Sequence, residues 1–108
     1  MNKGEIWLVE IPQTNGHEQT GKRPVIILAD TESNIAIVIP FTSNIHALRF
    51  PHTIEIKPSK GNGLTTMSVA LIFQIRAIDK KRVKNKIGNI EVLVMKRINE
   101  MLKMLLQI

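Results

Sequence analysis

Apolar residues recur at the short spacing of β-strands along the first three quarters of the chain. The strand-like segments are residues 5–11, 25–28, 35–41, 52–57 and 67–75, and most are rich in β-branched side chains. Residues 25–28 are apolar throughout, which predicts a strand that is buried on both faces. Turn-forming residues fill positions 30–34 and 60–63 and so separate neighbouring strands.

The pattern changes near the C-terminus. Residues 79–82 are predicted to form one helical turn, and residues 86–90 a last short strand, because Gly88 disfavours a helix there. From Glu91 onward apolar residues follow three- and four-residue steps, which predicts an amphipathic helix with Asn89 as its N-cap. We expect its broad apolar face to pack on the sheet, with part of it available to close a dimer.

These elements predict an α+β fold that is mainly β. The connections are too short for parallel crossovers, so the sheet is expected to be largely antiparallel. A small, strongly bent barrel of five to seven strands, followed by the C-terminal helix, is an economical way to protect the strand edges. At 108 residues, the whole chain is expected to form one domain.

Charge and aromatic content change the range of expected partners. The net charge of +6 favours a polyanionic partner such as a nucleic acid. Aromatic residues are scarce, comprising Trp7, Phe41, Phe50 and Phe73 with no Tyr, which argues against binding single strands mainly by stacking bases. Contacts with a nucleic acid are therefore expected from cations, amides and backbone groups.

Several kinds of chemistry are excluded by composition. The absence of Cys removes thiol catalysis and cysteine-based zinc sites. His46 and His52 have no third ligand at suitable spacing, so we expect neither a metal site nor a cofactor. The N-terminal residues are polar, and no apolar stretch approaches the ~20 residues of a membrane span. These features predict a cytoplasmic protein without a signal peptide or membrane contact.

The loop at residues 16–24 concentrates chemically active side chains. Its sequence is GHEQTGKRP, which places an imidazole, a carboxylate, an amide and two cations between two apolar strands. Loops mounted on a rigid sheet often carry function. The alternative is a solvated hairpin loop whose charges only keep the protein soluble.

Six segments of the chain form a recognisable combination. They are GEIWLV at 4–9, GHEQ at 16–19, GKRPV at 21–25, PFTS at 40–43, SVAL at 68–71 and QIRAIDKKR at 74–82. In this order they resemble the MazF/PemK (Kid) family of toxins from type II toxin–antitoxin systems.

The resemblance implies an SH3-like barrel, a homodimer and a metal-independent endoribonuclease. Such an mRNA interferase cuts single-stranded RNA at short specific sequences. A cognate antitoxin neutralises it, and we expect that antitoxin to dock an acidic peptide on the basic face that bears Arg23. Metal-free cleavage uses the neighbouring 2′-hydroxyl as nucleophile and leaves a 2′,3′-cyclic phosphate and a 5′-hydroxyl. It needs a base, an acid and donors for the phosphorane.

The resemblance assigns the expected catalytic residues. Arg23 and Thr42 match the Arg and Thr held to carry catalysis in the MazF branch. The planar, permanently charged fork of Arg23 suits phosphate, and Thr42 can donate a hydrogen bond to it. His17 matches a histidine of the Kid branch and can exchange a proton near neutral pH. It is expected either to assist as acid or base, or to position the phosphate, the alternative being a loop histidine that hydrogen-bonds the backbone.

Further residues are expected to bind RNA. We expect a mobile loop at residues 42–51 that helps to set the sequence preference. Glu18 is expected to order its own loop by pairing with a cation, Gln19 to read a base edge or bond the loop, and Arg76 to hold an RNA phosphate or a dimer salt bridge. The full set is Glu18, Gln19, Lys22, Ser43, Asn44, His46, Arg49, Gln74 and Arg76.

The chain departs from the family pattern at two positions. Leu71 and Phe73 occupy the places where the Kid branch has an Arg and an Asp with proposed catalytic roles, so only the Arg–Thr version of the chemistry survives. Phe73 is expected in the core or an interface, or stacked on a base. The departure leaves two alternatives open: a catalytically impaired member that binds RNA or antitoxin, and a CcdB-like toxin acting on a protein such as DNA gyrase.

Overall fold

Seven strands, three short 3-10 helices and one α-helix make up the computed structural model, which describes residues 1–12, 16–17 and 21–108. The strands are β1 (Glu5–Ile11), β2 (Gly21–Asp30), β3 (Ile35–Thr42), β4 (Thr53–Ile56), β5 (Ser68–Leu71), β6 (Arg76–Asp79) and β7 (Val83–Asn89). The 3-10 helices are η1 (Ile45–Arg49), η2 (Ile72–Gln74) and η3 (Lys80–Arg82), and α1 spans Val92–Leu106.

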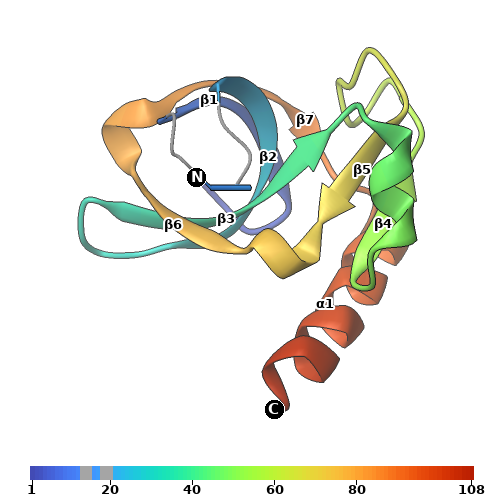
Figure 1. Cartoon of the computed structure of the whole chain (residues 1–108). Coiled ribbons are helices and arrows are strands. Elements are labelled where there is room, and N and C mark those ends of the chain that lie inside the picture. Colours follow the sequence, from blue (N-terminus) through green and yellow to red (C-terminus); the bar gives the residue numbers. More distant parts are fainter. Residues whose placement is uncertain (13–15, 18–20) are drawn as a thin grey trace.

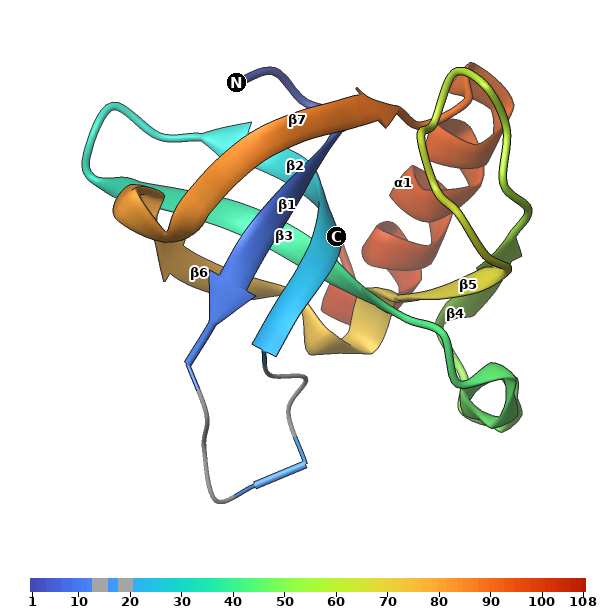
Figure 2. The same ribbon diagram turned by 90° about the horizontal axis from the view of Figure 1, so that it is seen from above.

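The strands form one antiparallel sheet in the order β4-β5-β3-β2-β1-β7, with β6 paired to β3. β3 holds this sheet together, because β2 pairs along one edge while β6 and β5 pair with successive parts of the other. The sheet curls strongly, so that β1, β2, β3, β6 and β7 enclose a barrel-like space with α1 beside β4 and β5 (Figures 1 and 2). The predicted α+β, mainly β fold, with five to seven antiparallel strands and a C-terminal helix, is confirmed, and the strands number seven in the described residues.

The central strands are buried on both faces. Ile6, Ile26 and Ile39 lie in one apolar cluster together with Ile98 of α1. Their neighbours along the strands belong to a second cluster, formed by Val9, Ile11, Val25, Ile27, Ala36, Val38 and Ile78. Because successive side chains of a strand alternate between faces, each strand contributes to both clusters. The predicted two-sided burial of residues 25–28 is therefore confirmed for Val25, Ile26 and Ile27, none of which has exposed surface.

The predicted long strand at residues 67–75 is wrong. β5 ends at Leu71, and η2 turns the chain before β6 begins at Arg76. The turn is needed because β5 pairs with the end of β3 whereas β6 pairs with its beginning. Ile72, which begins η2, is fully buried and fixes this turn to the core.

The predicted N-cap of the terminal helix is also wrong. Asn89 belongs to β7, and Glu91 takes the N-cap position without a side-chain cap bond. The carboxylate of Glu91 instead accepts hydrogen bonds from Ser59 Oγ at 2.8 Å and Asn62 Nδ2 at 3.3 Å. The start of α1 is thus tied to the loop that follows β4. None of the helices in the described part of the chain is long and apolar enough to cross a membrane.

Residues 42–51, where the sequence predicts a mobile loop, contain a short 3-10 helix. η1 begins after Asn44, whose Oδ1 accepts a hydrogen bond from the His46 backbone N–H at 3.1 Å. Asn at an N-cap satisfies a backbone donor that the helix itself leaves unpaired. The cap gives this segment a defined shape next to the end of β3.

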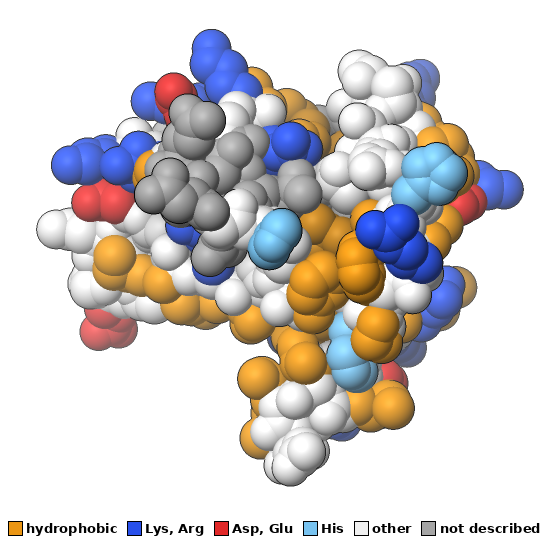
Figure 3. Space-filling view, viewed as in Figure 1, with side chains coloured by type: hydrophobic (Ala, Val, Ile, Leu, Met, Phe, Trp, Pro, Cys, Tyr) orange, Lys and Arg blue, Asp and Glu red, His pale blue; other side chains and the backbone are white. Residues whose placement is uncertain are grey.

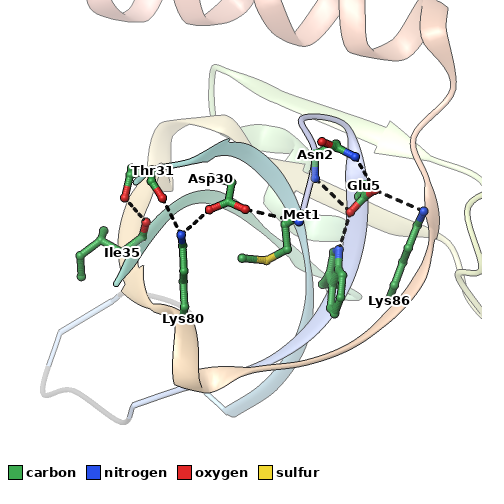
Figure 4. Close-up of polar contacts among 9 residues, drawn as sticks. Met1, Asn2, Glu5, Asp30, Thr31, Ile35, Lys80 and Lys86 are labelled. Carbon is green, nitrogen blue, oxygen red and sulfur yellow. Dashed lines mark hydrogen bonds and ion pairs between the residues drawn. The ribbon is translucent and has the colours of Figure 1, made fainter. Parts of the chain in front are cut away.

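The partly buried carboxylate of Glu5 makes an acid-sensitive contact in the fold (Figure 4). Glu5 Oε1 accepts hydrogen bonds from Trp7 Nε1 at 2.9 Å and the Asn2 N–H at 3.1 Å, and Lys86 Nζ lies 3.3 Å from Oε2. The Trp7 bond, then the Asn2 N–H and Lys86, lower the pKa of Glu5 to about 2 against the opposing effect of burial. The ionised form is therefore favoured in the folded state.

We expect Glu5→Gln to be less stable than the parent protein above pH 5, and the difference to shrink as the pH falls. The folded pKa lies below the unfolded value of 4.5, so the stabilisation is complete above that value and is lost on the way down to pH 2. Urea unfolding at several pH values, followed by the fluorescence of Trp7, measures the difference. A gap that stays constant between pH 6 and pH 2.5 would contradict this assignment.

Candidate active site

Two strands that separate create the space for a site. Val25 of β2 lies opposite Pro40 of β3, and the pairing of the two strands ends there. Extending the same alignment by two residues brings Arg23 level with Thr42. Thr42 itself pairs with Val69 of β5, so β3 continues toward β5 as β2 leaves it. The side chains of Arg23 and Thr42 face the opening between the strands.

The opening holds a cavity of about 380 Å³, here called the Arg23 cavity. β1, β2 and the end of β3 supply one part of the wall, and residues 63–66 with β5 and β7 supply the rest. The lining residues are Leu8, Lys22, Arg23, Pro24, Phe41, Thr42, Ser43, Gly63, Leu64, Thr65, Thr66, Ser68 and Ile87. Two cations and several hydroxyl groups therefore face one space, which suits an anion surrounded by hydrogen-bond donors.

A second cavity of about 550 Å³, here called the His17 cavity, adjoins the first at Thr42. It lies between the β1–β2 loop, η1 and η2, and its lining residues are His17, Thr42, Asn44, His46, Ala47, Arg49, Phe50, Leu71, Phe73 and Gln74. Figure 3 shows histidine and apolar side chains meeting on this face, next to Lys and Arg. Because Thr42 lines both cavities, a polymer with one group in each cavity would pass beside the Thr42 hydroxyl.

Thr42 is held in place by its neighbours. Its side chain is only 6% exposed, and Oγ1 accepts a hydrogen bond from the Asn44 backbone N–H at 3.2 Å. A threonine hydroxyl has one proton to donate besides its acceptor capacity. With the oxygen anchored by Asn44, that proton is suited to a ligand oxygen at the junction of the two cavities.

The loop that carries His17 is tied to a distant part of the chain. Gln74 Nε2 donates a hydrogen bond to the His17 backbone oxygen at 3.4 Å. Gln74 belongs to η2, the turn that interrupts the predicted strand at residues 67–75. This bond therefore links His17 to η2 at the His17 cavity. The imidazole of His17 is exposed there.

Most of the predicted site residues meet around these cavities. Lys22 and Ser43 join Arg23 and Thr42 in the Arg23 cavity. The His17 cavity gathers Asn44, His46, Arg49 and Gln74 around His17. Two predicted residues, Glu18 and Gln19, lie outside the described residues.

Arg76 does not join the other predicted residues. It lies on β6 opposite Val38 and lines a neighbouring hollow formed by residues 73–77, which shares Phe73 and Gln74 with the His17 cavity. The physical reason is that β6 leaves η2 toward the beginning of β3, whereas the site forms at the other end of that strand. Among the described lining residues, this places Arg76 outside both the Arg23 and the His17 cavity.

Sequence reasoning missed part of the wall. Thr65, Thr66 and Ser68 line the Arg23 cavity with three hydroxyl groups. Ser68 is 6% exposed and donates to the Thr66 carbonyl at 3.0 Å. A signal was present in the run of hydroxyl residues after the glycine-rich turn at 60–63, but nothing in the sequence places that run beside Arg23.

The electrostatic character of both cavities favours an anion. Lys22, Arg23 and Arg49 line them, and none of the described lining residues is Asp or Glu. Nor do the described residues contain a cluster of three or more His, Asp or Glu side chains that could hold a metal ion. Cations, hydroxyls, amides and two imidazoles, those of His17 and His46, are thus the polar groups at hand in the described part of the site.

Comparison with known proteins places the chain among toxins. A family profile described as "PemK-like, MazF-like toxin of type II toxin-antitoxin system" matches residues 2–106. An Endoribonuclease MazF from Staphylococcus saprophyticus is 35% identical over 103 residues, which cover 92% of this chain and 85% of that protein.

Solved structures share the fold. The crystal structure of MazF from Deinococcus radiodurans superposes with a TM-score of 0.82 at 21% identity, covering 100% of this chain and 97% of that one. A mycobacterial endoribonuclease, solved in complex with its cognate antitoxin, gives a TM-score of 0.71 at 17% identity and covers 98% of this chain and 94% of its own.

Proposed function

The chain belongs to the PemK-like, MazF-like toxin family of type II toxin–antitoxin systems, and on this premise we propose that it cleaves single-stranded RNA at short specific sequences without a metal ion. The family resemblance predicted from the sequence is thereby confirmed, and with it membership of a family of MazF endoribonucleases. One observation carries the finer proposal: Arg23 and Thr42 line a single cavity whose described walls hold no carboxylate.

The proposed reaction needs no group beyond the RNA and the protein. The 2′-hydroxyl of one nucleotide attacks the phosphorus on its 3′ side, the bond from phosphorus to the next 5′-oxygen breaks, and the products are a 2′,3′-cyclic phosphate and a 5′-hydroxyl. Negative charge accumulates on the phosphate oxygens on the way. The guanidinium of Arg23 and the hydroxyl of Thr42 stabilise that charge by charge-assisted and neutral hydrogen bonds.

The proton transfers are assigned to the His17 cavity. In this proposal the phosphate occupies the junction at Thr42, where the cavity lined by Arg23 meets the cavity lined by His17. An imidazole can accept the proton of the 2′-hydroxyl or donate one to the leaving oxygen. The described lining residues include one other imidazole, that of His46, which η1 carries.

Two partners complete the proposal. A cognate antitoxin would neutralise the toxin by laying an acidic segment on the basic face around Arg23. The partner itself is supported by the mycobacterial endoribonuclease of similar fold, which was solved in complex with its cognate antitoxin. A second copy of the chain would form a homodimer, with the exposed apolar side chains of α1 as part of the contact. Val92, Leu93 and Met104 are each more than 70% exposed. Residues 1–108 would act as one toxin domain.

The proposed activity can be tested with purified protein and a long single-stranded RNA in excess EDTA, beside a DNA of the same sequence. We expect the RNA to be cut at a few sites that share a short sequence, and the DNA to stay intact. Intact RNA after prolonged incubation with folded protein would contradict the proposal. It would leave a family member that only binds RNA or antitoxin, or one that acts on a protein target.

Thr42→Val is expected to lower kcat about 10-fold to 100-fold with little change in KM, because it removes a donor that acts mainly in the transition state. Thr42→Ser keeps the hydroxyl and is the matched control, expected to stay near the parent rate. Steady-state cleavage of a short RNA that contains one mapped site measures both. Equal rates for the Val variant and the parent would remove Thr42 from the chemistry.

His17→Ala is expected to lower kcat/KM roughly 10-fold to 100-fold and to flatten the pH–rate profile near neutrality, because a proton donor or acceptor is lost. His52→Asn is the control, since His52 lines neither cavity and Asn tolerates its positive φ of 58°. The profile should be measured from pH 5 to pH 9. A His17→Ala profile that follows the parent throughout would assign His17 to the loop alone.

A further inference from the structure

Two of the three phenylalanines meet at the rim of the His17 cavity. The rings of Phe50 and Phe73 are 5.7 Å apart between centroids and tilted by 54°. Phe50 is 44% exposed and Phe73 37% exposed, and both line the cavity. From the sequence alone, Phe73 is expected in the core or an interface, or stacked on a base. Its exposure beside a second ring puts it at the surface of the proposed site.

A cation and polar groups surround the ring pair. The guanidinium carbon of Arg49 lies 4.9 Å from the centroid of the Phe50 ring, within the range of a cation–π contact. Asn44 and Gln74 bring side-chain amides to the same cavity. An exposed aromatic ring bordered by amides and a cation offers a base both a stacking face and partners for its edge.

The local structure holds the rings in position. Phe50 follows η1, and its backbone N–H donates to the Ala47 oxygen at 3.1 Å. Phe73 sits within η2, whose first residue Ile72 is fully buried. Each ring is therefore fixed by a short helix that the core or a cap anchors. Stacking on such a surface loses less conformational entropy than stacking on a free loop.

We propose that the His17 cavity is a nucleobase subsite, in which the base beside the scissile phosphate stacks on the Phe50–Phe73 pair. The inference rests on the proposed ribonuclease function, because Thr42 joins this cavity to the one that holds the phosphate. Asn44 and Gln74 then select which base is bound.

The chemistry of the walls favours a base over an apolar peptide segment. Among the described residues that line the cavity are two histidines, two amides and Arg49, and none is acidic. These groups match a base attached to phosphate better than they match an aliphatic side chain. Cytosine, uracil, adenine and guanine all present a π-face, so stacking supplies affinity whereas the polar edge contacts supply selectivity.

The test separates stacking from contact with the sugar–phosphate chain. The probes are a fluorescent 2′-O-methyl octanucleotide pool of mixed sequence, which resists attack by its own 2′-oxygen, and an abasic octamer with the same backbone. The variants are Phe50→Leu/Phe73→Leu, which removes both π-faces, and Phe50→Tyr/Phe73→Tyr, which keeps them. Leu48→Ala is the control, since Leu48 lies in η1 with the same 37% exposure as Phe73 but does not line the cavity.

We expect the double Leu variant to bind the base-bearing pool roughly 10-fold or more weakly than the parent, and to bind the abasic octamer equally well. The double Tyr variant and Leu48→Ala should bind both probes like the parent. Unchanged binding of the pool by the double Leu variant overturns the subsite and leaves the cavity to a peptide segment. An equal loss for both probes overturns it as well, because the rings would then act only through the fold.

A second experiment, which maps the cleavage sites, locates the subsite on the RNA. Mapping all cut sites in a long RNA should show, for the double Leu variant, that the preference at one position next to the cleaved bond becomes flat while other positions are unchanged. A preference that stays the same at every position contradicts the inference. If the parent protein cuts no RNA, the proposed function fails, and the binding comparison still decides the subsite separately.

Discussion

Arg23→Ala is expected to lower kcat/KM for RNA cleavage by roughly 10²- to 10³-fold while leaving the fold intact. The size follows from the loss of one charged donor at the phosphate during the transition state. Arg23 is partly exposed on β2, and its side chain lines the cavity instead of filling the core. The change should therefore lower kcat strongly and leave the free energy of unfolding nearly unchanged.

Two further variants make the Arg23 result specific. Arg23→Lys keeps the charge but loses the planar fork, so we expect it to recover only part of the activity. Arg82→Ala removes an identical charge from a side chain of similar, intermediate exposure that lines neither cavity. It should cleave RNA at nearly the parent rate. An Arg23→Ala enzyme as active as Arg82→Ala would show that Arg23 contributes only general attraction to a polyanion.

Gly63→Ala is expected to have the largest effect on stability, a loss of about 2–4 kcal/mol. Gly63 has a φ of +71°, and a Cβ built on it would lie 2.0 Å from the Ile87 carbonyl oxygen of β7. The loop has little freedom to move away. Asn62 is fully buried, and its Oδ1 accepts hydrogen bonds from the Ser59 and Leu64 backbone N–H groups, both at 3.0 Å.

The same loop offers a close control. A Cβ at Gly61 would meet no atom within 4 Å, and Gly61 does not have positive φ. We expect Gly61→Ala to change the free energy of unfolding by less than about 1 kcal/mol, because the side chain meets no atom and the unfolded chain becomes less flexible. Urea unfolding followed by Trp7 fluorescence compares both variants with the parent. Similar stabilities for the two variants would contradict the tight packing of this loop on β7.

The Gly63 variant should also be less active than its stability alone predicts. Gly63, Leu64, Thr65 and Thr66 form one wall of the Arg23 cavity. Moving the loop away from β7 would displace that wall from Arg23. Cleavage by the fraction of protein that remains folded at low temperature measures this second effect.

Local patterns were sufficient to predict most strands and the terminal helix. The apolar run at residues 25–28 predicted burial on two faces, because no exposed position interrupts it. The turn at residues 72–74 could not be predicted in this way, since Leu71, Ile72 and Phe73 continue the apolar pattern of the preceding strand. The chain turns there because β3 offers two separate stretches of its edge to β5 and β6. Such a reason exists only in the assembled sheet.

In the candidate site, too, local features could be predicted from the sequence, whereas contacts that depend on the assembled sheet could not. The identities of Arg23 and Thr42 came from a family resemblance, and their proximity follows from the antiparallel alignment of β2 and β3. Contacts between segments far apart in sequence were not predicted. The meeting of Phe50 with Phe73 and the hydrogen bond from Gln74 to the His17 backbone both depend on the turn at η2. Arg76, although close to Gln74 in sequence, follows β6 away from the cavities.

The central claim is that the junction between the two cavities directs a neighbouring 2′-hydroxyl at the phosphate without a metal ion. One measurement tests it most directly: cleavage in EDTA of a short RNA with one mapped site, compared with the same RNA carrying a single 2′-deoxynucleotide on the 5′ side of the scissile bond. We predict a 2′,3′-cyclic phosphate from the first RNA and no cleavage of the second. Equal cleavage of both, or cleavage that appears only when Mg²⁺ is added, would contradict the account.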